Sequence, residues 1–291
     1  MTRTEPRDAV RRWQELVDRR RRQMETASAA AGLSRDDYWA GRAAQYARSI
    51  REVDRDDPFV ELVLQRVGPE STVLDVGAGT GRHAVRLAAV ARRVVAIDPS
   101  KAMLSYLEED ARRLGLRNIE VIAGAWPDVD APPADVAICS HVLYPIFDIV
   151  PFLRRLDAAA TWCFVYLRVD PLVTDLGLWG AFHDEPLTDQ PTHAHALDVL
   201  HELGLAPNVT VFRLEAQRSF ASWDEAVEQA LRSVCVADTP GARARVRALL
   251  GERLREDEDG MVRTPPQKIR TAVVWWGPGQ RPVEPGAARP F

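Results

Sequence analysis

The stretch "VLDVGAGTGRHA" (residues 73–84) combines an acidic residue with regularly spaced glycines, a pattern typical of a ligand-binding loop. An apolar run ends at Asp75 and gives way to three glycines at every second position, Gly77, Gly79 and Gly81. Glycine is tolerated where the backbone must turn sharply or approach a ligand. A dinucleotide-binding loop has the spacing G-x-G-x-x-G and holds a pyrophosphate. Here the third glycine comes one residue early, and Asp75 would repel a pyrophosphate. The loop therefore indicates a ligand that carries a positive charge.

The chain around this loop alternates between β-branched runs and helical patterns, which is typical of a doubly wound α/β sheet. The apolar runs are nearly continuous, which indicates strands that are covered on both faces. Helices are expected to begin near Gly81, at Ser100 and after Asp148. Strands are expected at 71–76, 93–97, 119–123, 135–140 and 162–167.

The second half of the chain has a different character. Residues 168–192 contain Pro, Gly, Trp and His without a regular period and are expected to form an insertion or lid. Ser222 with Glu225 forms a capping box, and Thr239-Pro240 opens another helix. A helix is also expected at 193–203, and strands at 208–214 and 271–276. We predict a Rossmann-like, seven-stranded, mostly parallel sheet with helices on both faces, its last two strands forming an antiparallel edge.

Ligands of an open α/β sheet bind at the carboxyl ends of its strands, near the switch in strand order. The glycine loop follows the first strand, and Asp98 ends the second. Asp98 is placed to accept hydrogen bonds from ribose hydroxyls, and Asp75 suits an ammonium group. These residues indicate a nucleoside with a cationic, amino-acid-like arm. S-adenosylmethionine has both features.

Four segments in register resemble the successive motifs of the class I S-adenosylmethionine-dependent methyltransferases. The order and spacing match over about residues 36–276. Two further segments, "SHVLYPIFDIVPFLRRL" and "LWGAFHDEP", resemble a group of bacterial methyltransferases. The resemblance implies an enzyme that moves a methyl group from S-adenosylmethionine to a small-molecule acceptor by in-line displacement, leaving S-adenosylhomocysteine. The four segments are "VLDVGAGTG" (73–81), "VVAIDPS" (94–100), "EVIAGAWPD" (120–128) and "ADVAICSHVLYP" (134–145).

The resemblance also implies a role for each matching position. Asp75 would meet the methionine ammonium, Asp98 both ribose hydroxyls, and Met103 the adenine. Ala125 stands where the family often has an acidic residue for the adenine amino group, so backbone groups of Ala125 and packing by Trp126 would have to substitute. The other expected cofactor-binding residues are Gly77, Ala78, Gly79, Gly81, Pro99, Gly124 and Ser140, with Tyr38, Trp39, Arg42 and Tyr46 on an N-terminal helical lid.

His141 follows the fourth strand, where this family places groups that face the transferred methyl. A neutral histidine there would remove a proton from the acceptor, or would only pack against the cofactor. Tyr144 has the same two interpretations. Both residues are therefore candidate catalytic residues, and the sequence leaves the need for a base open.

Other histidines have less specific surroundings. Trp179, Phe182 and His183 would line an acceptor pocket, or would belong to an ordinary surface loop. His193 and His195 do not converge on one helix face, and no third ligand is evident nearby. We expect no metal site.

Composition narrows the class of partner. The formal net charge is −4 over 291 residues, which argues against a general nucleic-acid binder. No apolar run approaches a membrane span of about 20 residues, so no membrane contact is expected. Three scattered cysteines in apolar surroundings are typical of free thiols in a reducing cytoplasm. The sequence does not reveal the acceptor or distinguish a monomer from a homodimer.

We divide the chain into an N-terminal helical arm or lid (1–50), a methyltransferase domain (51–276) with a substrate-side insertion (168–192), and an irregular tail (277–291). One alternative keeps the same fold, a catalytically silent protein that binds S-adenosylmethionine for regulation. A nicotinamide oxidoreductase is a third hypothesis, against which the glycine spacing and Asp75 argue.

Overall fold

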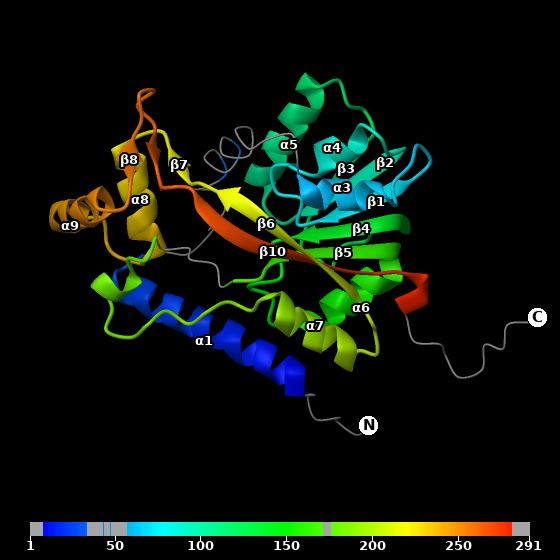
Figure 1. The fold of residues 1–291 in the computed structure, drawn as a ribbon, viewed down its shortest axis with the longest axis horizontal. Helices are drawn as coiled ribbons and strands as arrows, with labels where there is room; N and C mark the ends of the chain where they lie inside the picture. The colour runs from blue at the N-terminus through cyan, green and yellow to red at the C-terminus, as the bar shows by residue number, and fades with distance from the viewer. Residues whose placement is uncertain (1–7, 34–42, 44–46, 48–56, 171–175, 281–291) are drawn as a thin grey trace, which may run out of the picture.

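The computed structural model describes residues 8–33, 43, 47, 57–170 and 176–280 of the chain. A seven-stranded sheet forms its centre (Figure 1). In spatial order the strands are β3 (Ile119–Ala123), β2 (Arg93–Asp98), β1 (Thr72–Val76), β4 (Ala134–Ser140), β5 (Ala160–Arg168), β10 (Gln267–Trp276) and β6 (Asn208–Ala216).

The directions of the strands confirm the predicted fold class. Strands β1 to β5 run parallel, and β10 pairs antiparallel with both β5 and β6. Because β6 pairs antiparallel with β10, it runs in the same direction as β5. The strand order reverses between β1 and β4, so the carboxyl ends of these two strands diverge around the glycine loop.

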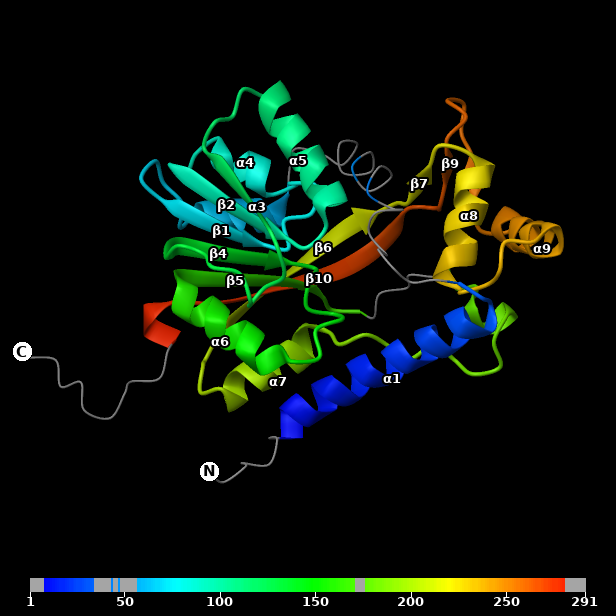
Figure 2. The same ribbon diagram turned by 180° about the vertical axis from the view of Figure 1, so that it is seen from behind.

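Helices cover both faces of the sheet (Figures 1 and 2). Side chains alternate across each strand, so Val73 of β1 packs into one core cluster and Leu74 into the other. This double burial explains the nearly continuous apolar runs of the sequence. One face carries α3 (Pro58–Leu64), α4 (Ala84–Ala88) and α5 (Lys101–Arg113), and the other carries α6 (Ile149–Ala159) and α7 (His193–Glu202).

The N-terminal helix α1 (Asp8–Ala30) packs outside α6 and α7. Trp13 is fully buried, and its indole N–H donates to the Ile146 carbonyl at 2.7 Å. The Glu202 carboxylate accepts from the amide of Ala9 at 2.6 Å, within the first turn of α1. These contacts hold α1 against the loop that follows β4 and against the end of α7.

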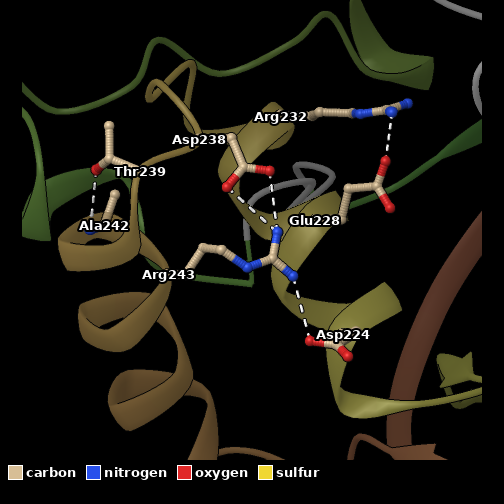
Figure 3. A network of polar contacts seen from close by, with 7 residues as sticks. All are labelled: Asp224, Glu228, Arg232, Asp238, Thr239, Ala242 and Arg243. Carbon is tan, nitrogen blue, oxygen red and sulfur yellow. Dashed lines mark hydrogen bonds and ion pairs between the residues drawn. The ribbon is translucent and has the colours of Figure 1, made fainter.

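A smaller unit is inserted between the end of β6 and the start of β10, beyond the carboxyl ends of the parallel strands (Figure 1). Arg243 joins its two helices by contacts to Asp224 at 3.2 Å and Asp238 at 2.9 Å (Figure 3). The helices were expected, but the small sheet was not, because strands of two residues leave no alternation to detect. The unit contains β7 (Ser219–Phe220), α8 (Trp223–Ser233), α9 (Pro240–Gly251), β8 (Arg255–Glu256) and β9 (Val262–Arg263).

Helix starts follow the predicted capping residues closely. The hydroxyls of Ser100, Ser222 and Thr239 accept from amides in the first turns of α5, α8 and α9. The helix expected near Gly81 begins three residues later, at Ala84, because the glycine turn continues further than its spacing indicates. The tail expected from residue 277 starts with an ordered turn, η3 (Pro278–Gln280), and residues 281–291 lie outside the described part. Among the described residues, no helix has the length and apolar character needed to cross a bilayer.

The buried indole of Trp13 should be a main anchor of α1. We expect Trp13→Ala to lower the free energy of unfolding by about 3–5 kcal/mol, through lost apolar burial and a cavity. Trp13→Phe keeps most of the apolar contact and loses the hydrogen bond, so it should cost about 1–2 kcal/mol. Urea denaturation followed by circular dichroism measures both losses. Equal losses in the two variants would mean that the hydrogen bond, not the packing, holds α1.

Candidate active site

The glycine loop lies at the carboxyl end of β1 and is attached to β2. The amides of Gly77 and Ala78 both donate to the Ile97 carbonyl, at 2.8 and 3.0 Å. All three glycines have positive φ, with 75° at Gly77, 55° at Gly79 and 85° at Gly81. A side chain would be strained at each of them, because L-residues rarely adopt this conformation.

Two of these glycines are also required by packing within the protein. A Cβ added at Gly77 would lie 2.2 Å from a methyl of Val142, and one at Gly81 would lie 2.6 Å from Leu107. The absence of side chains at these two positions is therefore explained without a ligand.

Asp98 connects the loops that follow three strands. One carboxylate oxygen accepts from the Gly79 amide at 2.9 Å, and the other from the Ser100 amide at 2.8 Å. Its own carbonyl accepts from the Gly124 amide at 3.0 Å. Asp98 is 8% exposed, and burial raises its pKa although both amides favour the charged form. Each carboxylate oxygen can accept a second hydrogen bond, so the group still has capacity for a ligand.

Asp75 lies in β1 directly before the loop and is 1% exposed. The amide of Ala84 donates to its carboxyl group, while Oδ2 has no hydrogen-bond partner among the described residues. Burial, and then the charge of Asp98, raise the pKa of Asp75 to about 7. An unpaired carboxyl oxygen in a buried site is costly unless a donor meets it. The free acceptor oxygen of Asp75 thus fits a ligand with an ammonium group.

The residues expected around the adenine lie in different parts of the structure. Met103 is buried at the start of α5 and Ala125 is exposed beside Gly124, both near the end of β2 or β3. Trp126 is turned away from them: its indole N–H donates to the Phe152 carbonyl of α6 at 3.2 Å, and it is 7% exposed. Because this ring packs in the hydrophobic core, Trp126 is not part of the proposed adenine site. Pro99 is exposed, and Ser140 is half-buried at the end of β4.

His141 directly follows β4 and is joined to Tyr144. Its backbone has φ 58°, a strained value for a residue with a side chain, and its amide donates to the Tyr166 carbonyl at 2.9 Å. Its Nδ1 lies 2.9 Å from the Tyr144 hydroxyl, which accepts from the Arg168 amide at 3.0 Å. Burial, and then the nearby cations, lower the pKa of His141 to about 3. The imidazole is therefore neutral at physiological pH.

Aromatic and charged residues that the sequence analysis did not select surround His141. The ring of Tyr166 lies 4.8 Å from that of His141 and is stacked on Phe59 at 4.7 Å. His83, on the edge of Phe59, lies 3.4 Å from the Asp57 carboxylate. Burial opposes ionisation of Asp57, but the hydrogen bond to His83 and the charge of Arg82 outweigh it and hold the pKa of Asp57 well below its usual range.

Arg82 and Asp57 form an ion pair at 2.8 Å, which joins the glycine loop to the start of α3. Asp57 also caps α3, since its carboxylate accepts from the Phe59 amide at 3.1 Å. The sequence carried one signal for this residue, the Asp-Pro step (57–58) that opens a helix. Nothing in the sequence indicated that the same carboxylate would reach the loop after β1.

Arg168 ends β5 two residues after Tyr166, so both side chains lie on the same face of the sheet. Its Nε is buried and has no hydrogen-bond partner among the described residues. The guanidinium charge acts on both His141 and Tyr144. Arg168 therefore brings an unpaired donor and a positive charge to the carboxyl ends of β4 and β5.

The other expected acceptor residues lie elsewhere. Trp179, Phe182 and His183 line a cavity of about 960 Å³ between α1, this segment and the end of α8. Its lining includes neither Asp98 nor His141, and His183 is bonded to the Val234 carbonyl at 2.6 Å. The structure does not bring these residues together with the glycine loop.

The remaining expectations concern two other segments. The lid residues Tyr38, Trp39, Arg42 and Tyr46 lie outside the described residues. His193 and His195 lie at the start of α7, where His195 takes part in the capping box with Thr192. No cluster of potential metal ligands occurs within the described ranges.

Comparison with known proteins identifies a methyltransferase domain in this chain. A family model described as a methyltransferase domain matches residues 73–160, which include the loop, Asp98 and His141. An uncharacterized protein of Haemophilus influenzae is 27% identical over 183 residues, which cover 61% of this chain and 67% of that protein. A probable ribosomal RNA small subunit methyltransferase A of Methanosarcina acetivorans is 35% identical over 91 residues, 31% of this chain and only 33% of that protein.

Among solved structures, the YcgJ protein of Bacillus subtilis has the same fold, with a TM-score of 0.52 at 14% identity. The alignment covers 78% of this chain and 99% of that one. The strand order, the loop after β1, the acidic residue that ends β2 and the family match agree with one another. Residues 73–160 therefore match a methyltransferase domain, and the fold of the chain supports a class I S-adenosylmethionine-dependent methyltransferase.

Proposed function

We propose that this chain transfers the methyl group of S-adenosylmethionine to a small-molecule acceptor, held at the carboxyl ends of β4 and β5. The observation that carries the proposal is the pair of buried carboxyl groups at the glycine loop. Asp75 has an unpaired oxygen for the methionyl ammonium. Asp98, held by the amides of Gly79 and Ser100, retains acceptor capacity for the ribose hydroxyls.

When bound, S-adenosylmethionine supplies a methyl group on a positively charged sulfur, and that charge disperses during transfer. The protein's part is to align the acceptor in line with the carbon–sulfur bond and to exclude water. His141 and Tyr144 lie after β4, on the side of the loop where the acceptor would enter. The Tyr144 hydroxyl is hydrogen-bonded to Nδ1 of His141 and accepts from the backbone amide of Arg168. These two contacts fix the orientation of the imidazole.

Charge favours a small molecule over RNA as the acceptor. The chain has 38 basic and 42 acidic residues, so it lacks the positive excess that phosphate backbones require. One relative that is named as a ribosomal RNA methyltransferase matches 91 residues of this chain and another matches 177 residues, so the proposal of a small-molecule acceptor rests on charge.

Titration with S-adenosylhomocysteine tests the cofactor site without knowledge of the acceptor. We expect one-to-one binding by isothermal calorimetry, together with a rise in melting temperature. Protein that is folded by circular dichroism but does not bind would contradict the proposed function. Methyl transfer to ribosomal RNA from labelled S-adenosylmethionine, with none to small molecules, would overturn the acceptor class alone.

Asp98 should be the main anchor of the nucleoside. Asp98→Ala leaves the Gly79 and Ser100 amides unpaired and removes the acceptor for the ribose, so we expect affinity for S-adenosylhomocysteine to fall by roughly 1.5–3 kcal/mol. Asp98→Asn retains one acceptor oxygen and should lose less. Glu108→Ala, an exposed carboxylate on the adjacent α5, is the matched control and should bind normally. Unchanged affinity in Asp98→Ala would show that Asp98 does not contact the ligand.

Asp75 should make cofactor binding depend on pH. Its pKa is raised to about 7, and the ammonium of the ligand needs the ionised form. Affinity for S-adenosylhomocysteine should therefore rise as pH increases from about 5.5 to 7.5 and then level off. Calorimetric titrations across this range measure the slope, which Asp75→Asn should remove while weakening binding. A slope that persists in Asp75→Asn would assign the proton to another group.

The same raised pKa has a consequence for stability without ligand. The folded state binds a proton on Asp75 between about pH 4 and pH 7 that the unfolded state has released, so stability should decrease as pH rises through this window. Asp75→Asn should therefore raise the melting temperature at pH 8 more than at pH 4. This outcome would also show that its loss of binding does not come from misfolding.

A further inference from the structure

The residues around His141 offer hydrogen-bond donors rather than a base. The Tyr144 hydroxyl accepts from the Arg168 amide, and donating its own proton to Nδ1 of His141, 2.9 Å away, would complete its hydrogen bonds. In the neutral imidazole, an Nδ1 that accepts leaves the proton on Nε2. His141 then presents an N–H, and its one lone pair for accepting a proton is already engaged by Tyr144.

The other titratable groups near His141 already contact other residues. His83 faces the Asp57 carboxylate, and the Tyr166 hydroxyl is bonded to Thr271 at 2.9 Å. Burial raises the pKa of Tyr144 and of Tyr166, so both remain protonated. Asp57 is held ionised by Arg82 and His83, which makes it a weak base.

Within the described part of the chain, Arg168 differs from the neighbouring cations in having no ion pair. Arg82 is paired with Asp57, and Arg270 with Asp170. Arg168 has no ion pair among the described residues, and its buried Nε has no acceptor. A buried, unsatisfied donor on a charged group is costly unless a ligand completes it, and a carboxylate matches guanidinium geometry well.

We infer that the methyl acceptor is a small carboxylic acid, bound as its carboxylate by Arg168 and the Nε2–H of His141, and that the product is a methyl ester. The inference rests on the proposed function and specifies its acceptor. A carboxylate needs no base, because it is ionised at neutral pH, and it matches the positive charge of Arg168. Tyr144 is a positioning residue, since it acts on the acceptor only through His141.

The reaction balances without a proton transfer. A lone pair of the carboxylate oxygen forms the new bond to the methyl carbon as the bond from that carbon to sulfur breaks, and the electrons of the broken bond remain on sulfur. The negative charge of the carboxylate and the positive charge of the sulfonium cancel. A phenol or alcohol acceptor would have to release a proton, and an Nδ1 of His141 that accepts from Tyr144 is not free to take it.

The tautomer of His141 is measurable on the protein saturated with S-adenosylhomocysteine. In a ¹⁵N NMR spectrum of labelled protein we expect His141 to carry its proton on Nε2, with Nδ1 unprotonated. Tyr144→Phe removes the donor to Nδ1 and should produce a mixture of tautomers in a folded protein. A proton on Nδ1 in the unaltered protein would overturn the inference.

The charge requirement is tested with two probes of matched shape. Benzoate and its neutral counterpart benzamide are titrated separately against the protein saturated with S-adenosylhomocysteine, and the His141 signals are followed. We expect benzoate to bind and benzamide to bind roughly tenfold or more weakly, because only the former satisfies Arg168. Arg168→Gln should remove the preference, and Arg168→Lys should restore part of it. The absence of a preference in the unaltered protein would overturn the inference.

The chemistry of the product gives a separate readout. S-adenosylmethionine labelled in its methyl group is offered with pools of carboxylic acids, phenols or amines. A product that releases labelled methanol in mild base is a methyl ester and supports the inference. Label that is stable to base overturns the carboxylate acceptor and leaves the proposed function intact. Failure to bind S-adenosylhomocysteine, measured first, would instead contradict the proposed function itself.

Discussion

The carboxylate of Asp98 is the interaction on which the geometry of the site depends. It accepts from the amide of Gly79 after β1 and from the amide of Ser100 at the start of α5, while its carbonyl accepts from Gly124 after β3. One residue thus holds together three loops that are separate in sequence. Charge-assisted hydrogen bonds to backbone amides are among the stronger ones in proteins. They keep the glycine turn open in a defined shape before any ligand arrives.

This arrangement brings two buried carboxyl groups close together. Asp75 lies next to the loop that Asp98 supports. Burial raises the pKa of both groups, and the negative charge of Asp98 raises the pKa of Asp75 further. A ligand with a fixed positive charge offsets the cost of ionising these groups, and a pyrophosphate would increase it. The electrostatics therefore select S-adenosylmethionine over a dinucleotide by charge, in agreement with the spacing of the glycines.

The acceptor side of the site has the opposite electrostatic character. Arg168 supplies a positive charge that has no ion pair among the described residues, and the chain of hydrogen bonds from the Arg168 amide through Tyr144 orients His141. The strained backbone of His141 is maintained by its amide bond to the Tyr166 carbonyl, within the pairing of β4 and β5. A rigid donor array costs no reorganisation when a substrate binds, which is how such sites assist reactions.

Much of the fold and the cofactor half of the site could be predicted from the sequence. The positions of Asp75, the glycines and Asp98 depend on strand ends, and strand ends depend on local patterns of apolar residues and turns. The capping residues Ser100, Ser222 and Thr239 were identifiable for the same reason, because each acts on an amide two or three residues away. The small sheet β7–β9–β8 was not, since its strands are too short to carry a pattern.

The contacts of side chains whose partners are distant in sequence could be found only from the folded structure. Trp126 belongs to the core because α6 supplies the Phe152 carbonyl, and Trp179 lines a cavity beside α1 rather than the glycine loop. Asp57 and Arg168 became candidates only when folding placed them near His83 and His141. The helices, the longer strands and the residues at their ends could be predicted from the sequence alone, because backbone conformation depends on neighbouring residues along the chain. The direction and the partners of each side chain were decided by packing between elements, which no local pattern encodes.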